Sequence, residues 1–151
     1  MINNKKINKF AISIIEDLRK NNFQAYLVGG CVRDLLCRIE PKDFDIATNA
    51  TPNEIKKIFK ASRIIGKRFK LVHIYNRSDL IEVATFRSGD DRTNDGSLIT
   101  DQSGKILRDN IWGTLEQDTF RRDFTINALY YCPITKKIED HNNGIKHIHE
   151  K

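Results

Sequence analysis

The feature that most constrains this chain is a pair of adjacent glycines between two short segments of strand character. Residues Ala25 to Val28 are predicted to form a strand that runs into Gly29-Gly30, and Phe44 to Ala47 are predicted to form a second strand. A brief helix is expected between them, from about Cys31 to Leu36. Such a close succession of strands and a helix indicates a fold of the α+β type.

The rest of the chain continues this alternation of helices and strands. An amphipathic helix is expected before Asn21-Asn22, with an apolar side formed by Ile7, Phe10, Ala11, Ile14 and Leu18. Thr51-Pro52-Asn53-Glu54 is a capping box with proline at the first helical position, so it predicts a helix start. Further strands are expected at Lys70 to Tyr75, Leu80 to Phe86, Tyr131 to Ile134 and Lys137 to Asp140, and helical segments at Leu115 to Phe120 and Phe124 to Tyr131. We therefore expect residues 1–151 to form one α+β domain, a mixed sheet of about five strands with helices packed on it.

Composition narrows the range of partners and compartments. The chain has 151 residues and a net charge of +6, which favours a polyanionic partner such as nucleic acid. Its cysteines, Cys31, Cys37 and Cys132, show no CxxC spacing, so we expect reduced thiols in a cytoplasmic protein. The N-terminus lacks the apolar run of a signal peptide, and no segment reaches membrane-spanning length. We therefore expect no membrane partner.

The second predicted strand carries two aspartates in alternation. In an extended segment Asp43 and Asp45 point to one face, while Phe44 and Ile46 point to the other and anchor the strand in the core. Two metal ions about 3.5–4 Å apart need bridging carboxylates, and side chains two residues apart on a strand can supply them. An Asp-x-Asp pair is also common on solvated surfaces, so the pattern alone leaves both readings open.

The glycine pair strengthens the case for a ligand. Gly29-Gly30 allows the backbone to approach a ligand closely, and the N-terminus of the following helix favours an anion. Arg33, in the first turn of that helix, has the geometry to contact a phosphate bidentately. The required residues of the dinucleotide-binding and P-loop motifs are absent. The alternative is a tight packing turn in which Arg33 pairs with Asp34 or another surface acid.

A glutamate interrupts an otherwise apolar strand. Glu82 shares a face with Leu80, Ala84 and Phe86, where a charge is unfavourable unless it is paired or bound to metal. Equally compatible with the sequence is an edge strand that leaves Glu82 partly exposed.

Residues 121–127 form a third polar constellation. The sequence is Arg121-Arg122-Asp123-Phe124-Thr125-Ile126-Asn127. Asp123 is suited to be the N-cap of a helix that carries Phe124 and Tyr131. In a functional interpretation, Arg122 contacts a triphosphate, Asp123 lies beside the sugar or the metals, and Asn127 follows one helical turn later. The two interpretations are compatible.

Taken together, these segments resemble the head domain of the class II template-independent RNA nucleotidyltransferases. That family comprises bacterial poly(A) polymerases and CCA-adding tRNA nucleotidyltransferases. The resemblance runs from about residue 5 to the end and rests on Leu27 to Asp34, Asp43 to Asp45, Glu82 to Arg87 and Arg121 to Leu129. Two further segments favour the poly(A) polymerases over CCA addition: Ile64 to Ile74, with Lys67 where arginine is usual, and Ile106 to Gly113.

The resemblance implies a polymerase-beta-like catalytic fold and a division of labour at one site. Asp43 and Asp45 would hold two Mg²⁺ ions, one beside the 3′-hydroxyl of an RNA end and one on the triphosphate of ATP. Asp123 would be a third essential carboxylate, a role for which Glu82 competes. The residues implied in nucleotide binding are Gly29, Gly30, Arg33, Arg122 and Asn127. The implied reaction is in-line attack of the hydroxyl on the α-phosphate, with release of pyrophosphate.

The sequence departs from the family in its extent. In relatives the head continues into helical neck and body domains that select the nucleobase and hold RNA, and this chain reaches Lys151 before any neck. We expect a poly(A) polymerase head that adds AMP to RNA 3′ ends, with a CCA-adding head as the alternative. A non-catalytic RNA-binding remnant remains a third possibility, because the specificity-determining domains are missing. The sequence predicts no oligomeric state.

Overall fold

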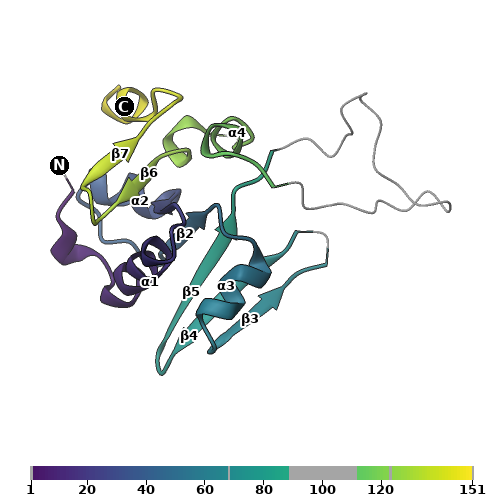
Figure 1. Ribbon diagram of the computed structural model, residues 1–151. Coiled ribbons are helices and arrows are strands. Elements are labelled where there is room, and N and C mark those ends of the chain that lie inside the picture. The colour runs from purple at the N-terminus through teal and green to yellow at the C-terminus, as the bar shows by residue number, and fades with distance from the viewer. Residues whose placement is uncertain (1, 68, 89–111, 123, 151) are drawn as a thin grey trace, which may run out of the picture.

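One mixed sheet organises the chain in the computed structural model, which describes residues 2–67, 69–88, 112–122 and 124–150. The strands are β1 (Ala25–Val28), β2 (Asp45–Thr48), β3 (Ser62–Ile65), β4 (Leu71–Asn76), β5 (Asp79–Thr85), β6 (Tyr130–Cys132) and β7 (Lys137–Glu139). Their order across the sheet is β3-β4-β5-β2-β1-β6-β7 (Figure 1). Strands β2 and β5 run parallel, and the other neighbouring pairs are antiparallel. The predicted α+β fold with a mixed sheet is confirmed, and the described residues contribute seven strands where about five were expected.

Short helices flank the sheet. They are η1 (Asn4–Lys6), α1 (Lys9–Lys20), α2 (Gly30–Leu36), α3 (Pro52–Ile58), α4 (Leu115–Phe120), η2 (Thr125–Asn127) and α5 (Gly144–His149). The side chain of Asn8 caps α1 by accepting from the backbone N–H groups of its first turn. The predicted capping box of Thr51 and Glu54 opens α3 with both of its hydrogen bonds formed. None of the helices in the described part of the chain combines the length and apolar character needed to cross a bilayer.

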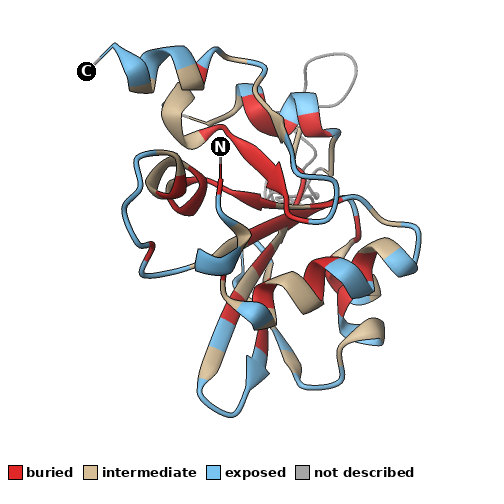
Figure 2. Ribbon diagram, turned by 90° about the vertical axis from the view of Figure 1, so that its left-hand side faces the viewer, coloured by how far each residue is buried: buried red, intermediate tan, exposed pale blue. Residues whose placement is uncertain are grey.

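The two faces of the sheet pack against different elements. Because side chains alternate along a strand, Leu27 and Ile46 point to one face and Val28 and Ala47 to the other. The first face forms a large aliphatic core with residues of α1 and α3, including Ile14 and Ile55. The second face forms a smaller cluster of Val28, Ala47, Phe86, Leu115 and Tyr130. Figure 2 shows the buried residues concentrated where the sheet meets the helices.

The predicted helix from Phe124 to Tyr131 is wrong. Residues Thr125–Asn127 form a single 3-10 turn, and Tyr130–Cys132 form strand β6 beside β1. All three residues of β6 are buried, and an apolar run buried on both sides lacks the alternation that distinguishes a strand from a helix. The hairpin of β6 and β7 was expected, although β6 begins one residue earlier. Most of the predicted segment Ile106 to Gly113 lies outside the described residues.

Candidate active site

A row of polar side chains crosses the centre of the sheet. Asp45, the first residue of β2, is aligned with Glu82 of the parallel strand β5. Glu82 is in turn aligned with His73 of the antiparallel strand β4. Residues aligned across neighbouring strands project from the same face, about 4.8 Å apart along the hydrogen-bonding direction. The row therefore lies on the face that α4 covers further along the sheet, opposite the aliphatic core.

Asp45 lies in a strongly negative environment. The pKa of its carboxyl is raised to about 6, first by burial and then by the charges of Glu82 and Asp43, while the charge of Arg122 acts in the opposite direction. Asp43 precedes β2 and is exposed, whereas Phe44 packs against the aliphatic core and Ile46 is fully buried. The expected anchoring of this segment by its apolar residues is confirmed. A positive charge placed among these carboxylates would relieve their mutual repulsion.

Glu82 occupies a central strand, so the alternative of an edge strand is wrong. Strand β5 lies between β4 and β2. Atom Oε1 of Glu82 is 3.3 Å from Nε2 of His73, and the two side chains are 39% and 22% exposed. Glu82 is thus both partly exposed, as expected, and paired.

The glycine turn brings two distant motifs together. Gly29 adopts a φ of +80°, in the region that favours glycine, and its N–H donates to the carbonyl of Leu129. Arg33 donates from Nη1 to Oδ1 of Asn127 at 2.9 Å, across 94 positions of the chain. It also forms the ion pair with Asp34 that the packing alternative predicted, with an N–O distance of 3.1 Å. Arg33 and Asn127, predicted separately as nucleotide-binding residues, are therefore in direct contact.

Arg122 is held by a buried aspartate that the sequence analysis missed. Asp118 of α4 is 1% exposed and accepts from Nε and Nη2 of Arg122 at 3.2 and 3.1 Å. It also accepts from Nε of Arg121 at 2.9 Å, from the hydroxyl of Tyr130, and from the backbone N–H of Arg87 at 3.0 Å. Burial alone raises the pKa of Asp118, but Arg122, Tyr130 and Arg121 together hold it below its ordinary value. Its spacing of three and four residues from the arginines on a predicted helix was the available signal.

Asp123 lies outside the described residues, so its roles as a third carboxylate and as a helix cap stay predictions. The cap position of η2 is occupied by Phe124. The predicted metal site is likewise incomplete: within the described ranges, no group of three or more His, Cys, Asp or Glu side chains is arranged around a common point. The donor types nevertheless suit Mg²⁺, which prefers oxygen ligands such as carboxylates. The pKa of Asp45 is raised by burial and by the neighbouring carboxylates, so a cation beside it would stabilise its ionised form.

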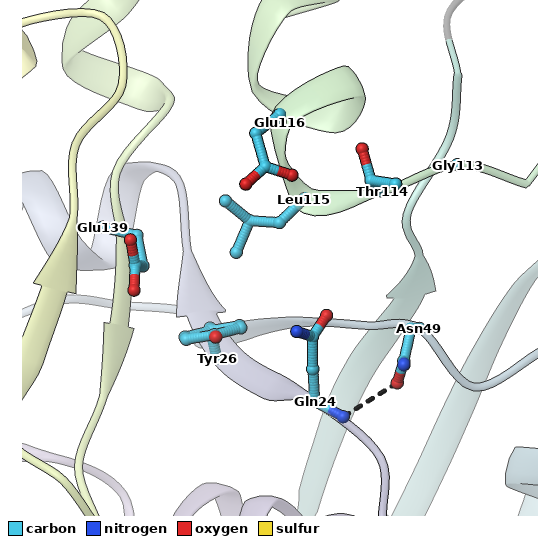
Figure 3. Close-up of a pocket in the computed structure, with 8 residues that line it drawn as sticks. All are labelled: Gln24, Tyr26, Asn49, Gly113, Thr114, Leu115, Glu116 and Glu139. Carbon is cyan, nitrogen blue, oxygen red and sulfur yellow. Dashed lines mark hydrogen bonds between the residues drawn. The ribbon is translucent and has the colours of Figure 1, made fainter.

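A separate pocket lies at the other end of β1 and β2 (Figure 3). It has a volume of about 340 Å³ and is lined by Gln24, Tyr26, Asn49, Gly113, Thr114, Leu115, Glu116 and Glu139. None of the predicted site residues lines it. The ring of Tyr26, which lines the pocket, meets that of Tyr130, which belongs to the Asp118 network, edge to face with a centroid distance of 6.2 Å.

The fold with this site is that of the polymerase-beta-like nucleotidyltransferase heads. The crystal structure of the CCA-adding enzyme of Bacillus stearothermophilus in complex with CTP matches 92% of this chain and 31% of its own, with a TM-score of 0.70 and 34% identity. The family model of the poly A polymerase head domain matches residues 25–151. The chain therefore belongs to the poly(A) polymerase head domain family.

Individual relatives agree with this assignment. Poly(A) polymerase I of Haemophilus influenzae is 48% identical over 147 residues, which are 96% of this chain and 32% of that protein. The CCA-adding enzyme of Bacillus pumilus is 35% identical over 146 residues, 93% of this chain and 33% of that enzyme. The chain thus spans about one third of the length of the curated relatives it matches.

Proposed function

We propose that this chain is the catalytic head of an RNA nucleotidyltransferase that transfers AMP from ATP to RNA 3′ ends, and that residues 1–151 act as one head domain. The observation that carries the proposal is the alignment of Asp45 and Glu82 on neighbouring parallel strands, beside Arg122. A poly(A) polymerase head is favoured over a CCA-adding head because poly(A) polymerase I of Haemophilus influenzae is 48% identical and the CCA-adding enzyme of Bacillus pumilus 35%.

In this proposal the carboxylates form the metal-binding part of the site. Asp43 and Asp45 hold two Mg²⁺ ions, and Glu82, which is aligned with Asp45 on the neighbouring strand, is the third carboxylate of the site. When bound, Mg²⁺ supplies Lewis-acid activation of the 3′-hydroxyl and neutralisation of the triphosphate. The residues of the chain hold these oxygens in place before the substrates arrive, so little reorganisation remains for the reaction itself.

The glycine turn and two arginines are assigned to the phosphates. Gly29 and Gly30 leave space for a close approach of backbone N–H groups to a triphosphate. Arg33 is fixed by its hydrogen bond to Asn127, and Arg122 is fixed by its two hydrogen bonds to the buried carboxylate of Asp118. A guanidinium that is already oriented loses less conformational entropy when it binds a phosphate. The reaction is in-line attack of the RNA 3′-hydroxyl on the α-phosphate, with pyrophosphate as the leaving group.

The test incubates the chain with RNA, Mg²⁺ and each labelled nucleotide in turn, and measures ATP binding in parallel by calorimetry. We expect AMP addition to arbitrary RNA 3′ ends and loss of both AMP addition and metal-dependent ATP binding in Asp45→Asn. Asp17→Asn, at an exposed position of α1, is the matched control and should change neither. Wild-type protein that retains RNA but binds no ATP with Mg²⁺ would refute the proposal.

A CCA-adding head is the second candidate. The observation in its favour is the match to the CCA-adding enzyme of Bacillus stearothermophilus, at a TM-score of 0.70. The same assay separates the two functions, because extension confined to tRNA ends, with CTP used before ATP, would assign CCA addition.

A further inference from the structure

His73 is the third member of the polar row formed with Asp45 and Glu82, and the proposed mechanism gives it no role. It lies on β4, aligned with Glu82 of β5, which is aligned with Asp45 of β2. Its Nε2 is 3.3 Å from Oε1 of Glu82, and its side chain is only 22% exposed. The ring of Tyr75 meets the imidazole edge to face, with a centroid distance of 6.4 Å. The imidazole therefore has restricted freedom to turn away from the carboxylate.

The chemistry of the His73–Glu82 pair defines which of the two groups donates the hydrogen bond. An ionised carboxylate only accepts hydrogen bonds, so Nε2 of His73 carries the proton and donates to Oε1 of Glu82. The second oxygen of Glu82 has no hydrogen-bond partner among the described residues. Glu82 is near enough to Asp45 for its charge to act on that carboxyl. One oxygen is thus held by His73, and the other remains available beside Asp45.

We propose that His73 is a positioning residue, which fixes the carboxylate of Glu82 so that its second oxygen joins Asp45 in binding the divalent cation. The inference rests on the proposed function, because it concerns the same metal site. A hydrogen bond from outside the coordination sphere orients a ligating carboxylate, and loss of such a bond typically weakens metal affinity by about 10–100-fold. His73 does not touch the cation or the nucleotide in this scheme.

The competing explanation is an ordinary cross-strand pair. Aligned polar residues of an antiparallel pair stabilise a sheet by about 0.2–1 kcal/mol without any ligand. In that case replacement of His73 would lower stability slightly and leave metal affinity unchanged. The two explanations therefore predict different metal affinities for a His73 variant: the positioning role predicts weaker binding, and the cross-strand pair predicts no change.

The experiment measures Mn²⁺ binding to the chain by electron paramagnetic resonance of the free ion, without RNA or turnover. We expect His73→Ala to weaken Mn²⁺ affinity about 10-fold. His73→Gln should restore most of the affinity, because its amide nitrogen can donate to Glu82 from a similar position. The control is Leu80→Ala, which lies two aligned pairs further along the same strands, is 49% exposed, and should leave the affinity unchanged.

The outcomes separate the inference from the function on which it rests. If Asp45→Asn weakens Mn²⁺ binding and His73→Ala does not, the positioning role is refuted and the proposed function stands. If Asp45→Asn also has no effect, the metal site itself is refuted, and the inference with it. Thermal unfolding of each variant verifies folding, and should His73→Ala not fold, equal affinities of His73→Gln and His73→Leu would refute the positioning role.

Discussion

The two faces of the central sheet are stabilised by different kinds of interaction. The face under α1 and α3 is filled by aliphatic side chains such as Ile14 and Ile55, each fully buried. The opposite face combines a small aromatic and aliphatic cluster with buried charge, in which Asp118 satisfies two arginines and a tyrosine. At Asp45 burial and the charges of Glu82 and Asp43 outweigh the opposing charge of Arg122, so the pKa of this carboxyl is raised. The first face is thus stabilised by apolar burial, whereas part of the second face retains electrostatically unfavourable charge.

The largest effect is expected on the polar face, from Asp118→Ala. Removal of one partner from a buried ion pair leaves the other charges without compensation, so we expect a loss of about 3–5 kcal/mol in the free energy of unfolding. Urea denaturation at pH 7 measures it. A loss below about 1 kcal/mol would show that the arginines relax into solvent, and the contrast between the two faces would then be weaker than the contacts suggest.

The same network gives a pH dependence of defined sign. Because the pKa of Asp118 in the folded protein lies below its ordinary value of 3.8, this group stabilises the fold above about pH 4. That stabilisation is lost as the pH falls through the folded pKa. The stability difference between wild type and Asp118→Asn should therefore shrink below pH 4 and be constant near neutrality.

On the aliphatic face the comparable change is Ile14→Ala. It removes buried methyl and methylene groups and leaves a cavity, for which we expect a loss of about 3 kcal/mol. Unlike the loss in Asp118→Ala, it should be independent of pH between 4 and 8, because no titratable group takes part. Urea denaturation across that range measures both variants side by side, and a strong pH dependence of Ile14→Ala would contradict the separation of the faces.

The glycine turn should show a smaller effect of conformational origin. Gly29→Ala places a side chain at a φ of +80°, which is expected to destabilise the protein by about 1–3 kcal/mol. Gly30→Ala is the matched control, because a Cβ there meets only the flexible end of Arg33, at 3.3 Å. Equal losses at both positions would mean that crowding, rather than backbone conformation, determines the requirement for glycine.

The smallest expected effect on stability is that of Asp45→Asn, which should stabilise the protein rather than destabilise it. The pKa of Asp45 is raised to about 6 in the folded protein from an ordinary 3.8, so the folded state binds more protons between these values. Stability therefore falls as the pH rises from 4 to 6, and the penalty is complete above pH 6. Asp45→Asn should then stabilise the metal-free protein by about 1 kcal/mol at pH 8, with allowance for partial exposure, and by almost nothing at pH 4.

Added Mg²⁺ provides the control for this last prediction. A cation that binds only the folded state raises the unfolding temperature of wild type, and it should not do so in Asp45→Asn. Stabilisation of the variant by Mg²⁺ to the same extent would place the cation elsewhere on the protein.

Sequence patterns predicted most of the helices and strands whose signals lie within a few residues of one another. The bounds of α4 at Leu115–Phe120 and the capping box of α3 were expected from residues within a few positions of one another. Strand β3 was missed because it is a four-residue edge strand with mostly half-buried side chains and no clear alternation. Strand β6 was expected at Tyr131 to Ile134, but the preceding helix was extended wrongly to Tyr131, because burial on both sides removes the alternation that marks the start of a strand.

The candidate site was predictable in its residues but not in its contacts. The motifs containing Arg33 and Asn127 were both identified, yet their hydrogen bond joins positions 94 residues apart. Asp118 was missed because its importance comes from the hydroxyl of Tyr130 and the backbone of Arg87, which only the folded chain brings to it. The spacing of residues in the sequence can identify a charged candidate residue. Its role depends on the tertiary contacts and the burial that the fold provides.

The parallel pairing of β2 and β5 also determines when the site can exist during folding. Asp45 and Glu82 meet only after α3, β3 and β4 have been traversed and a parallel register has been closed, which is a slow, non-local event. Helices α1 and α3 can form earlier from their own local signals. The proposed affinity for a divalent cation should consequently be among the last properties the chain acquires as it folds, and the first it loses when the register between these strands slips.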